Sequence, residues 1–133
     1  MSEIQEDILF YISEKRTTLP TTLRLTEKLD YEVGLVKLIY PAKLSDEEKE
    51  SIIYVHCNLV ESVNIGNKKD SVLDALRIEF STTEYKPPNI LYMPTSQKIV
   101  SEIEIHFRNS KGKELLDDDW LIVLHLRPAI PHL

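Results

Sequence analysis

The residues most capable of chemistry in this sequence are three histidines, His56, His106 and His125. Each is expected on the outward face of a different strand, and three imidazoles are a legitimate ligand set for zinc. They could converge only if those strands were neighbours, and no HxH or HExxH spacing supports a metal site. The alternative is a solvated or subunit-contact face, where their titration near neutrality would tune a contact with pH. We favour that alternative and expect no metal and no cofactor.

The single cysteine and the acidic run near the C-terminus are the other candidates for chemistry. Cys57 alternates inward with Val55 and Leu59, as a small core residue would. A nucleophilic thiol needs a base, and the adjacent His56 must point to the opposite face of the same strand. Residues 117–119 are all aspartate but lack the spacing and the glycine of a calcium loop. With no G-x-S-x-G elbow and no evident pair of catalytic carboxylates, we predict that the protein is not an enzyme.

The composition is that of an ordinary globular protein of one domain, residues 1–133, with 42% hydrophobic and 29% charged residues. The net charge of −6 argues against nucleic acid as the main partner. The three glycines lie far apart, which excludes phosphate-binding loops built from closely spaced glycines. No apolar run is long enough for a membrane-spanning helix, and the acidic N-terminus lacks the features of a secretory signal. We therefore expect an intracellular protein, in cytoplasm or nucleus, that neither binds membranes nor is secreted.

Hydrophobic and polar residues alternate with period two along much of the chain, which is typical of strands with one buried face. The pattern predicts strands over residues 31–40, 51–60, 75–80, 99–107 and 120–127. Residues 8–12 favour a strand by propensity, although Ile4, Ile8 and Ile12 also have helical spacing, and residues 89–93 fit a short edge strand or an extended crossing segment. Pro20 is expected to limit any extension of the first strand. Residues 64–70 and 108–112 are expected to form turn-rich connections, and residues 43–50 are expected to form one helical turn or a polar loop. The sequence thus predicts an all-β protein, a single antiparallel β-sandwich of about seven or eight strands.

The alternation also assigns side chains to the two faces of each strand. Over residues 99–107 the odd positions form the apolar face, which places Val100 and His106 on the outward face. Over residues 120–127 the even positions face the core, so Leu121, Val123 and His125 face outward. Outward apolar and aromatic residues are candidates for a contact surface, with the plain alternative that loops cover them. The candidate interface residues are Tyr54, His56, Tyr92, Val100, His106, Leu121, Val123 and His125.

Several short motifs occur in an order that resembles one protein family. They are Tyr31–Leu35 followed by Ile39–Pro41, Ile53–Ser62, Gly66, Leu76–Ile78, Pro88–Pro94, Ile103–Ile105 with Gly112, and Val123–Arg127. These segments are similar to the W-E-V-G-L … Y-P, Y-V-Y-C-N-V-V-E-S, L-L-R-I, P-x-Y-x-P, I-E-V and V-x-L-H-F-R segments of a protein encoded by Maverick/Polinton-type elements and their adintovirus relatives. The resemblance covers roughly residues 20 to 128, and it rests on the shared order of the motifs rather than on any one of them.

The resemblance implies a jelly-roll fold and the role of a minor, penton-like capsid protein. Such a protein is a homo-oligomer, expected to be a pentamer, that contacts a major capsid protein and resides in the virion. It has no catalytic residues, so the motifs mark core and assembly positions. The family has further strands between its Y-P and Y-V-x-C segments, where this sequence has only residues 42–50. Either the jelly roll has a shortened set of strands, or the N-terminal part of the chain supplies the missing ones.

Two other functions stay open at this point. One is a monomeric β-sandwich that binds a protein partner, such as a shortened descendant adopted by a host. The other is a sandwich that binds a metal or a small ligand through its outward histidines.

Overall fold

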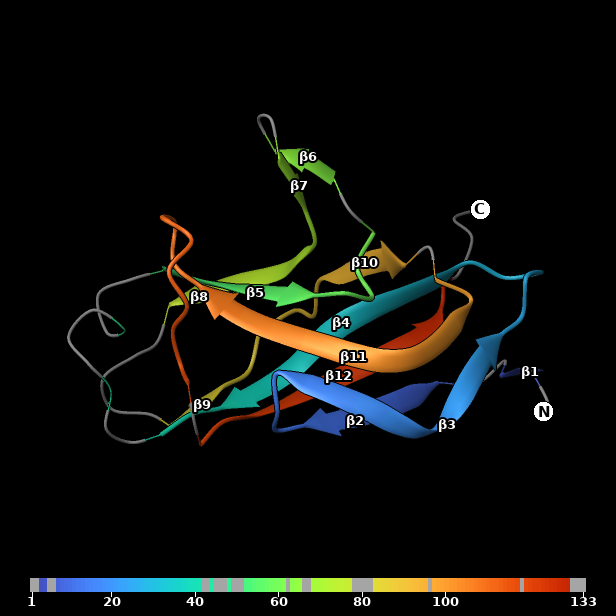
Figure 1. Ribbon diagram of the computed structural model, residues 1–133, viewed down its shortest axis with the longest axis horizontal. Helices are drawn as coiled ribbons and strands as arrows, with labels where there is room; N and C mark the ends of the chain where they lie inside the picture. The colour runs from blue at the N-terminus through green and yellow to red at the C-terminus, as the bar shows by residue number, and fades with distance from the viewer. Residues whose placement is uncertain are drawn as a thin grey trace.

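Two β-sheets packed over a common core form the body of the protein in the computed structural model (Figure 1). The structure describes residues 3–4, 7–41, 44, 48, 52–61, 63–65, 68–77, 83–95, 97–117 and 119–129. Within them the strands are β1 (Glu3–Ile4), β2 (Ile8–Ile12), β3 (Arg16–Leu25), β4 (Tyr31–Ile39), β5 (Ile52–Cys57), β6 (Val63–Ile65), β7 (Lys68–Asp70), β8 (Val72–Arg77), β9 (Glu84–Tyr85), β10 (Tyr92–Thr95), β11 (Ile99–Arg108) and β12 (Leu121–Pro128). The prediction of an all-β sandwich is confirmed.

The strands form two main sheets. Sheet I has the order β1-β3-β11-β5-β8, and sheet II has the order β10-β4-β12-β2, with β9 also beside β4. The short strands β6 and β7 form a separate hairpin that projects from the sandwich (Figure 1). Every strand pair is antiparallel except the contact of β1 with β3, which is parallel.

Eight of the strands have four or more residues, and they pair in a nested way. The first and last of the eight, β2 and β12, are neighbours, and so are the second and seventh, β3 and β11. The third and sixth, β4 and β10, and the fourth and fifth, β5 and β8, pair in the same manner. One long antiparallel hairpin rolled into two sheets has this pairing, which is the strand order of a jelly roll. The described residues thus contain a full set of eight strands, two of which, β2 and β3, lie in the N-terminal part. Of the two alternatives, the shortened set was wrong.

The core lies between the sheets and is built from the inward faces of the alternating strands. Its most deeply buried side chains include Val33, Leu35, Leu38, Ile53, Val55, Ile103, Ile105, Phe107, Ile122 and Leu124. Burial of each such side chain contributes about 1.5–3 kcal/mol before the entropy of ordering is counted. The buried Trp120 belongs to this core, with its ring edge-to-face on Phe107 at a centroid distance of 4.8 Å.

A bulge in β11 reverses the faces at the start of that strand. The register against β3 shifts between Val100 and Glu102, so the alternation that holds from Ile103 to Phe107 does not extend back to Ile99. Ile99 is consequently exposed, whereas Val100 points into the core and is 1% exposed. The prediction of Val100 as an outward interface residue was therefore wrong, because a bulged residue shifts every side chain before it to the opposite face.

Strand β3 was not predicted. Its sequence, RTTLPTTLRL, contains few apolar residues, and Pro20 lies at its centre. The pairing with β11 tolerates the proline because the register skips this part of β3: Val100 pairs with Leu23, and Glu102 pairs with Thr18. Proline is accepted where a strand is irregular and no ladder hydrogen bond depends on its missing N–H.

The remaining differences concern strand ends and connections. The strand expected over 89–93 is β10, which begins three residues later at Tyr92, and the connection expected over 64–70 is the β6-β7 hairpin. The turn over 108–112 is confirmed: Gly112 has a φ of +84°, and its amide donates to the carbonyl of Asn109. Most of residues 43–50, and residues 78–80 of the strand expected over 75–80, lie outside the described residues.

Candidate functional site

The three histidines lie on two different surfaces. His56 on β5 and His106 on β11 are direct register partners on the outer face of sheet I. His125 lies on the outer face of sheet II, so the core separates it from the other two. Among the described residues, no group of three or more His, Cys, Asp and Glu side chains could hold a metal ion. The hypothesis of a three-histidine site was wrong, because the jelly-roll order distributes the strands over both sheets.

A row of register partners crosses the outer face of sheet II. Tyr92 of β10 pairs with Gly34 of β4, Gly34 pairs with His125 of β12, and His125 pairs with Leu9 of β2. Gly34 has no side chain, so Tyr92 reaches across it, and its hydroxyl lies 2.7 Å from Nδ1 of His125. The two rings meet edge-to-face at a centroid distance of 5.7 Å. Tyr92 and His125, predicted separately as outward residues, are therefore in direct contact.

Three charged residues complete this arrangement, which we name the outer cluster: Asp7, Glu32, Tyr92, His125 and Arg127. Oδ2 of Asp7 lies 3.2 Å from Nε2 of His125, and Nε of Arg127 donates to Oε1 of Glu32 at 2.8 Å. The Arg127 guanidinium also lies over the Tyr92 ring, 3.5 Å from its centroid, which is a cation–π contact. A neutral His125 with its proton on Nε2 satisfies both neighbours, accepting from Tyr92 and donating to Asp7.

The outer cluster joins β10, β4 and β12 of sheet II and the residue before β2. Tyr92 belongs to β10, Glu32 to β4, and His125 and Arg127 to β12, whereas Asp7 immediately precedes β2. The connectivity of hydroxyl, imidazole and carboxylate is that of a hydrolytic triad, but here the hydroxyl belongs to a tyrosine and the Asp7 side chain is 64% exposed. Its evident effect is to fix four strands relative to one another on the outer side.

Position 34, at the centre of this face, has no room for a side chain, so glycine is required there. A Cβ atom at position 34 would lie 2.5 Å from Cγ2 of Ile90 and 2.9 Å from Cε1 of Tyr92. Contacts that short are essentially never found for a real Cβ atom. The glycine therefore allows the segment before β10 to pack flat on β4, and this places the Tyr92 hydroxyl within reach of His125.

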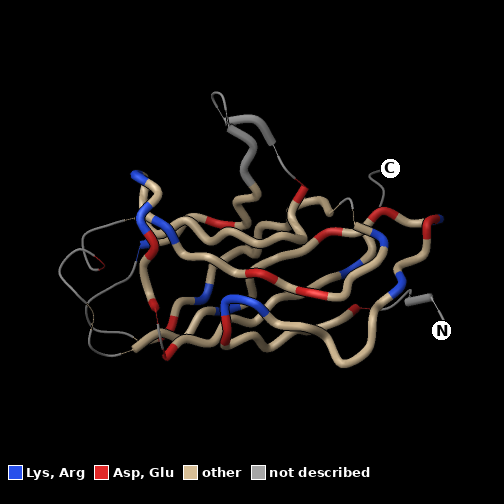
Figure 2. Tube along the Cα trace, viewed as in Figure 1, with Lys and Arg blue, Asp and Glu red and all other residues tan. Residues whose placement is uncertain are grey.

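The outer face of sheet I is charged and paired. Figure 2 shows acidic residues along β11, and Arg16 of β3 bonds two of them, Glu102 at 2.8 Å and Glu104 at 2.6 Å. The hydrogen bond from Arg16 is the largest cause that lowers the pKa of Glu104. Tyr54 and His56 lie on the same face, half-buried opposite Arg108 and His106.

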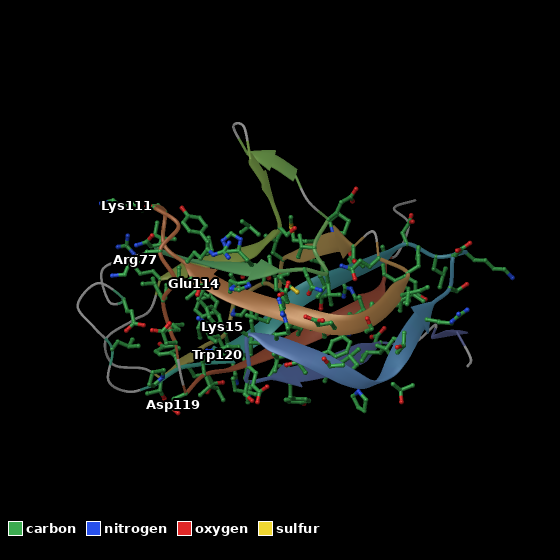
Figure 3. All side chains as sticks on the ribbon, viewed as in Figure 1. Lys15, Arg77, Lys111, Glu114, Asp119 and Trp120 are labelled. Carbon is green, nitrogen blue, oxygen red and sulfur yellow. The ribbon has the colours of Figure 1, made fainter. Side chains whose placement is uncertain are left out.

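A second group of charges lies at one end of sheet I. Glu114 is bonded by Lys15 at 2.9 Å and by His106 at 2.7 Å, and these partners lower the pKa of its carboxyl group, Lys15 having the larger effect. Lys15, Glu114 and Trp120 lie towards the same end of the sandwich (Figure 3). The pairs tie the segment that follows the 108–112 turn to the ends of β3 and β11.

The exposed apolar residues differ from those predicted. Val123 faces outward, as expected, but it is 3% exposed because its register neighbours Tyr11 and Lys37 lie on either side of it. Its prediction as an interface residue was wrong, and Leu121 is half-buried. The prediction missed Leu9 and Tyr11, which are 51% and 65% exposed on β2. Their alternation with the buried Phe10 was the signal that could have identified them.

Cys57 lies in the core, as its alternation predicted. The thiol is buried between the sheets, and desolvation raises its pKa to about 12. A thiol is a nucleophile only as the thiolate, so this environment keeps Cys57 unreactive at neutral pH.

The fold and its outer surfaces define a jelly-roll β-sandwich with one polar cluster on sheet II and one charged face on sheet I. Comparison of the chain with protein-family models, with curated proteins and with solved structures finds no match. In the described part of the chain, no helix has the length and apolar character needed to cross a membrane.

Proposed function

We propose that this protein is a non-enzymatic structural protein, a penton-like minor capsid component that acts by assembling into a pentamer. The observation that carries the proposal is the nested pairing of eight strands in jelly-roll order. Jelly rolls are the fold of many viral shell proteins. The order of motifs shared with Maverick/Polinton capsid proteins points in the same direction, and several of those motifs meet in the outer cluster.

The surfaces of the molecule are compatible with ring formation. Subunits in a ring meet through two different surfaces, since a contact between identical surfaces closes at a dimer. Sheet II presents the exposed Leu9 and Tyr11 on β2, and the exposed Leu91 just before β10 on the other side of the sheet. The proposed partners are therefore further copies of this chain and a major capsid protein, and the proposed location is the virion within the infected cell.

The mass of the purified full chain in solution tests this proposal. Size-exclusion chromatography with light scattering should give five times the chain mass of 15.4 kDa, which is 77 kDa. Negative-stain electron microscopy of that peak should show rings with fivefold symmetry. A species of 15.4 kDa at every protein concentration, from low to high salt, would rule the pentamer out.

The second candidate is a monomeric β-sandwich that binds a protein partner. The observation in its favour is the exposed edge strand β2, because sheet edges can accept an added strand from a peptide. A strictly monomeric protein in the experiment above would favour this candidate.

A further inference from the structure

We propose that neighbouring copies meet head to tail across the two opposite edges of sheet II. One contact surface, the β2 edge, consists of Leu9 and Tyr11. The other, the proline edge, consists of Pro88, Leu91 and Pro94. The occupant of each edge is a second copy of this chain. This inference rests on the proposed self-assembly, and it specifies which surfaces of neighbouring copies are in contact.

The two edges lie on opposite sides of the same sheet. Strand β2 ends sheet II on one side, and on the other side β9 and β10 both pair with β4, so the segment between them follows this edge. In Figure 1, β2 and β10 lie at opposite sides of the sandwich. A ring needs two different surfaces on opposite sides of each subunit, and these edges satisfy that requirement.

Exposure of large apolar side chains concentrates on these edges. Leu9 and Tyr11 are 51% and 65% exposed, and Leu91 is 54% exposed. Among the described residues, three of the five exposed large hydrophobic side chains belong to the two proposed surfaces. Adjacent exposed apolar side chains mark contact surfaces, whereas single ones are ordinary.

The two surfaces also complement each other chemically. A proline-rich segment docks on aromatic side chains at a low entropic cost, because its backbone is already restricted. Here Tyr11 supplies the aromatic ring, and the segment that docks on it contains Pro88, which follows another proline. The exposed Asp7 and Glu14 flank β2, whereas Lys86, which begins the proline segment, lies 3.4 Å from Glu84. Contact of β2 with itself would bring these acidic residues of two copies together, and this repulsion favours the heterologous contact.

Strand β2 also lacks the protection that the other edges have. Proteins protect exposed sheet edges with prolines, charges and bulges. Pro94 lies in β10, and β8 has Asp74 and Arg77 together with a shift in register. Strand β3, which β1 covers only at Arg24 and Leu25, contains Pro20. Residues Ile8–Ile12 of β2 contain no proline or charge, and their register with β12 is regular. Such an edge is expected to be covered in the assembled protein.

Two single variants and their mixture test the inference. Tyr11→Glu alters only the β2 edge, and Leu91→Glu alters only the proline edge. Each variant alone should be a monomer by light scattering. An equimolar mixture retains one intact pair of surfaces, so it should form a 1:1 heterodimer of twice 15.4 kDa, or 31 kDa, and nothing larger. The control is Ile52→Glu, which changes an exposed apolar residue of sheet I and should leave the wild-type oligomer unchanged.

The outcomes separate this inference from the proposed function. A monomeric wild-type protein contradicts both. A wild-type oligomer that survives both variants contradicts the inference alone. If Leu91→Glu assembles normally while Tyr11→Glu does not, the contact is β2 with itself, and the head-to-tail arrangement is refuted. Fluorescence of the buried Trp120 verifies folding, and Tyr11→Ser and Leu91→Ser replace any variant that fails to fold.

Discussion

Substitution of Gly34 by alanine should destabilise the protein by crowding the outer face of sheet II. The added Cβ atom would lie 2.5 Å from Cγ2 of Ile90 and 2.9 Å from Cε1 of Tyr92. Either the segment before β10 moves away from β4, or the Tyr92 ring tilts. Both movements lengthen the 2.7 Å contact between the Tyr92 hydroxyl and His125.

The magnitude follows from these two effects. Insertion of a methyl group into a well-packed site costs about 1–3 kcal/mol, and loss of one hydrogen bond costs about 1 kcal/mol. The half-buried Ile90 can shift part of the way, so we expect a loss of about 2 kcal/mol in the free energy of unfolding. Urea denaturation followed by Trp120 fluorescence should show this as a lower midpoint with an unchanged slope.

Gly112 is the matched control, because its requirement for glycine is conformational. It has a φ of +84°, and nothing lies within 4 Å of the position of an added Cβ atom. Asparagine tolerates positive φ, so Gly112→Asn should cost less than Gly112→Ala. At position 34 the order should reverse, since asparagine is larger than alanine. The Gly34→Ala/Ile90→Ala double variant should recover about 1 kcal/mol relative to additivity. A free energy of unfolding for Gly34→Ala within about 0.5 kcal/mol of the wild-type value would refute the steric reasoning.

Three further outcomes follow from the titratable groups. Partial burial raises the pKa of the Asp74 carboxyl group. The contribution of this group to stability is therefore complete below the unfolded-state pKa and is lost as pH rises through the folded-state pKa. Urea denaturation should show that Asp74→Asn stabilises the protein at neutral pH and has no benefit in acid. Lys15 and His106 lower the pKa of the Glu114 carboxyl group, so the contribution of this group to stability is present above the unfolded-state pKa and is lost as pH falls. Glu114→Gln should lower the free energy of unfolding by less than about 1 kcal/mol at neutral pH, because these ion pairs are exposed. A larger loss would contradict the exposure of the pairs. Cys57 should not react with a thiol reagent in the native protein and should react fully in denaturant; rapid labelling of the native protein would contradict its burial.

The strands that were predicted from the sequence are those with one face in the core. Over β12 and most of β11 the burial of one face enforces the alternation, so the pattern identifies the strand and its inward side. The same reasoning could not find β3, because its side chains are mostly exposed or half-buried and its position depends on pairing with β11. It also could not place Val100, since the bulge beside that residue is a property of the pair of strands. Periodicity reports the environment of one strand, and these features need two.

The outer cluster shows the same limit at the level of a site. Alternation correctly placed His125 on an outward face, but a face does not say which residues of other strands share its row. That depends on register, which brings Tyr92, Gly34 and His125 together from three strands far apart in the chain. Glu32 and Arg127 form the adjacent row. The sequence motifs that contain these residues thus have one physical explanation: a tyrosine of β10 reaches across a glycine of β4 to a histidine of β12, and flanking charges hold it there.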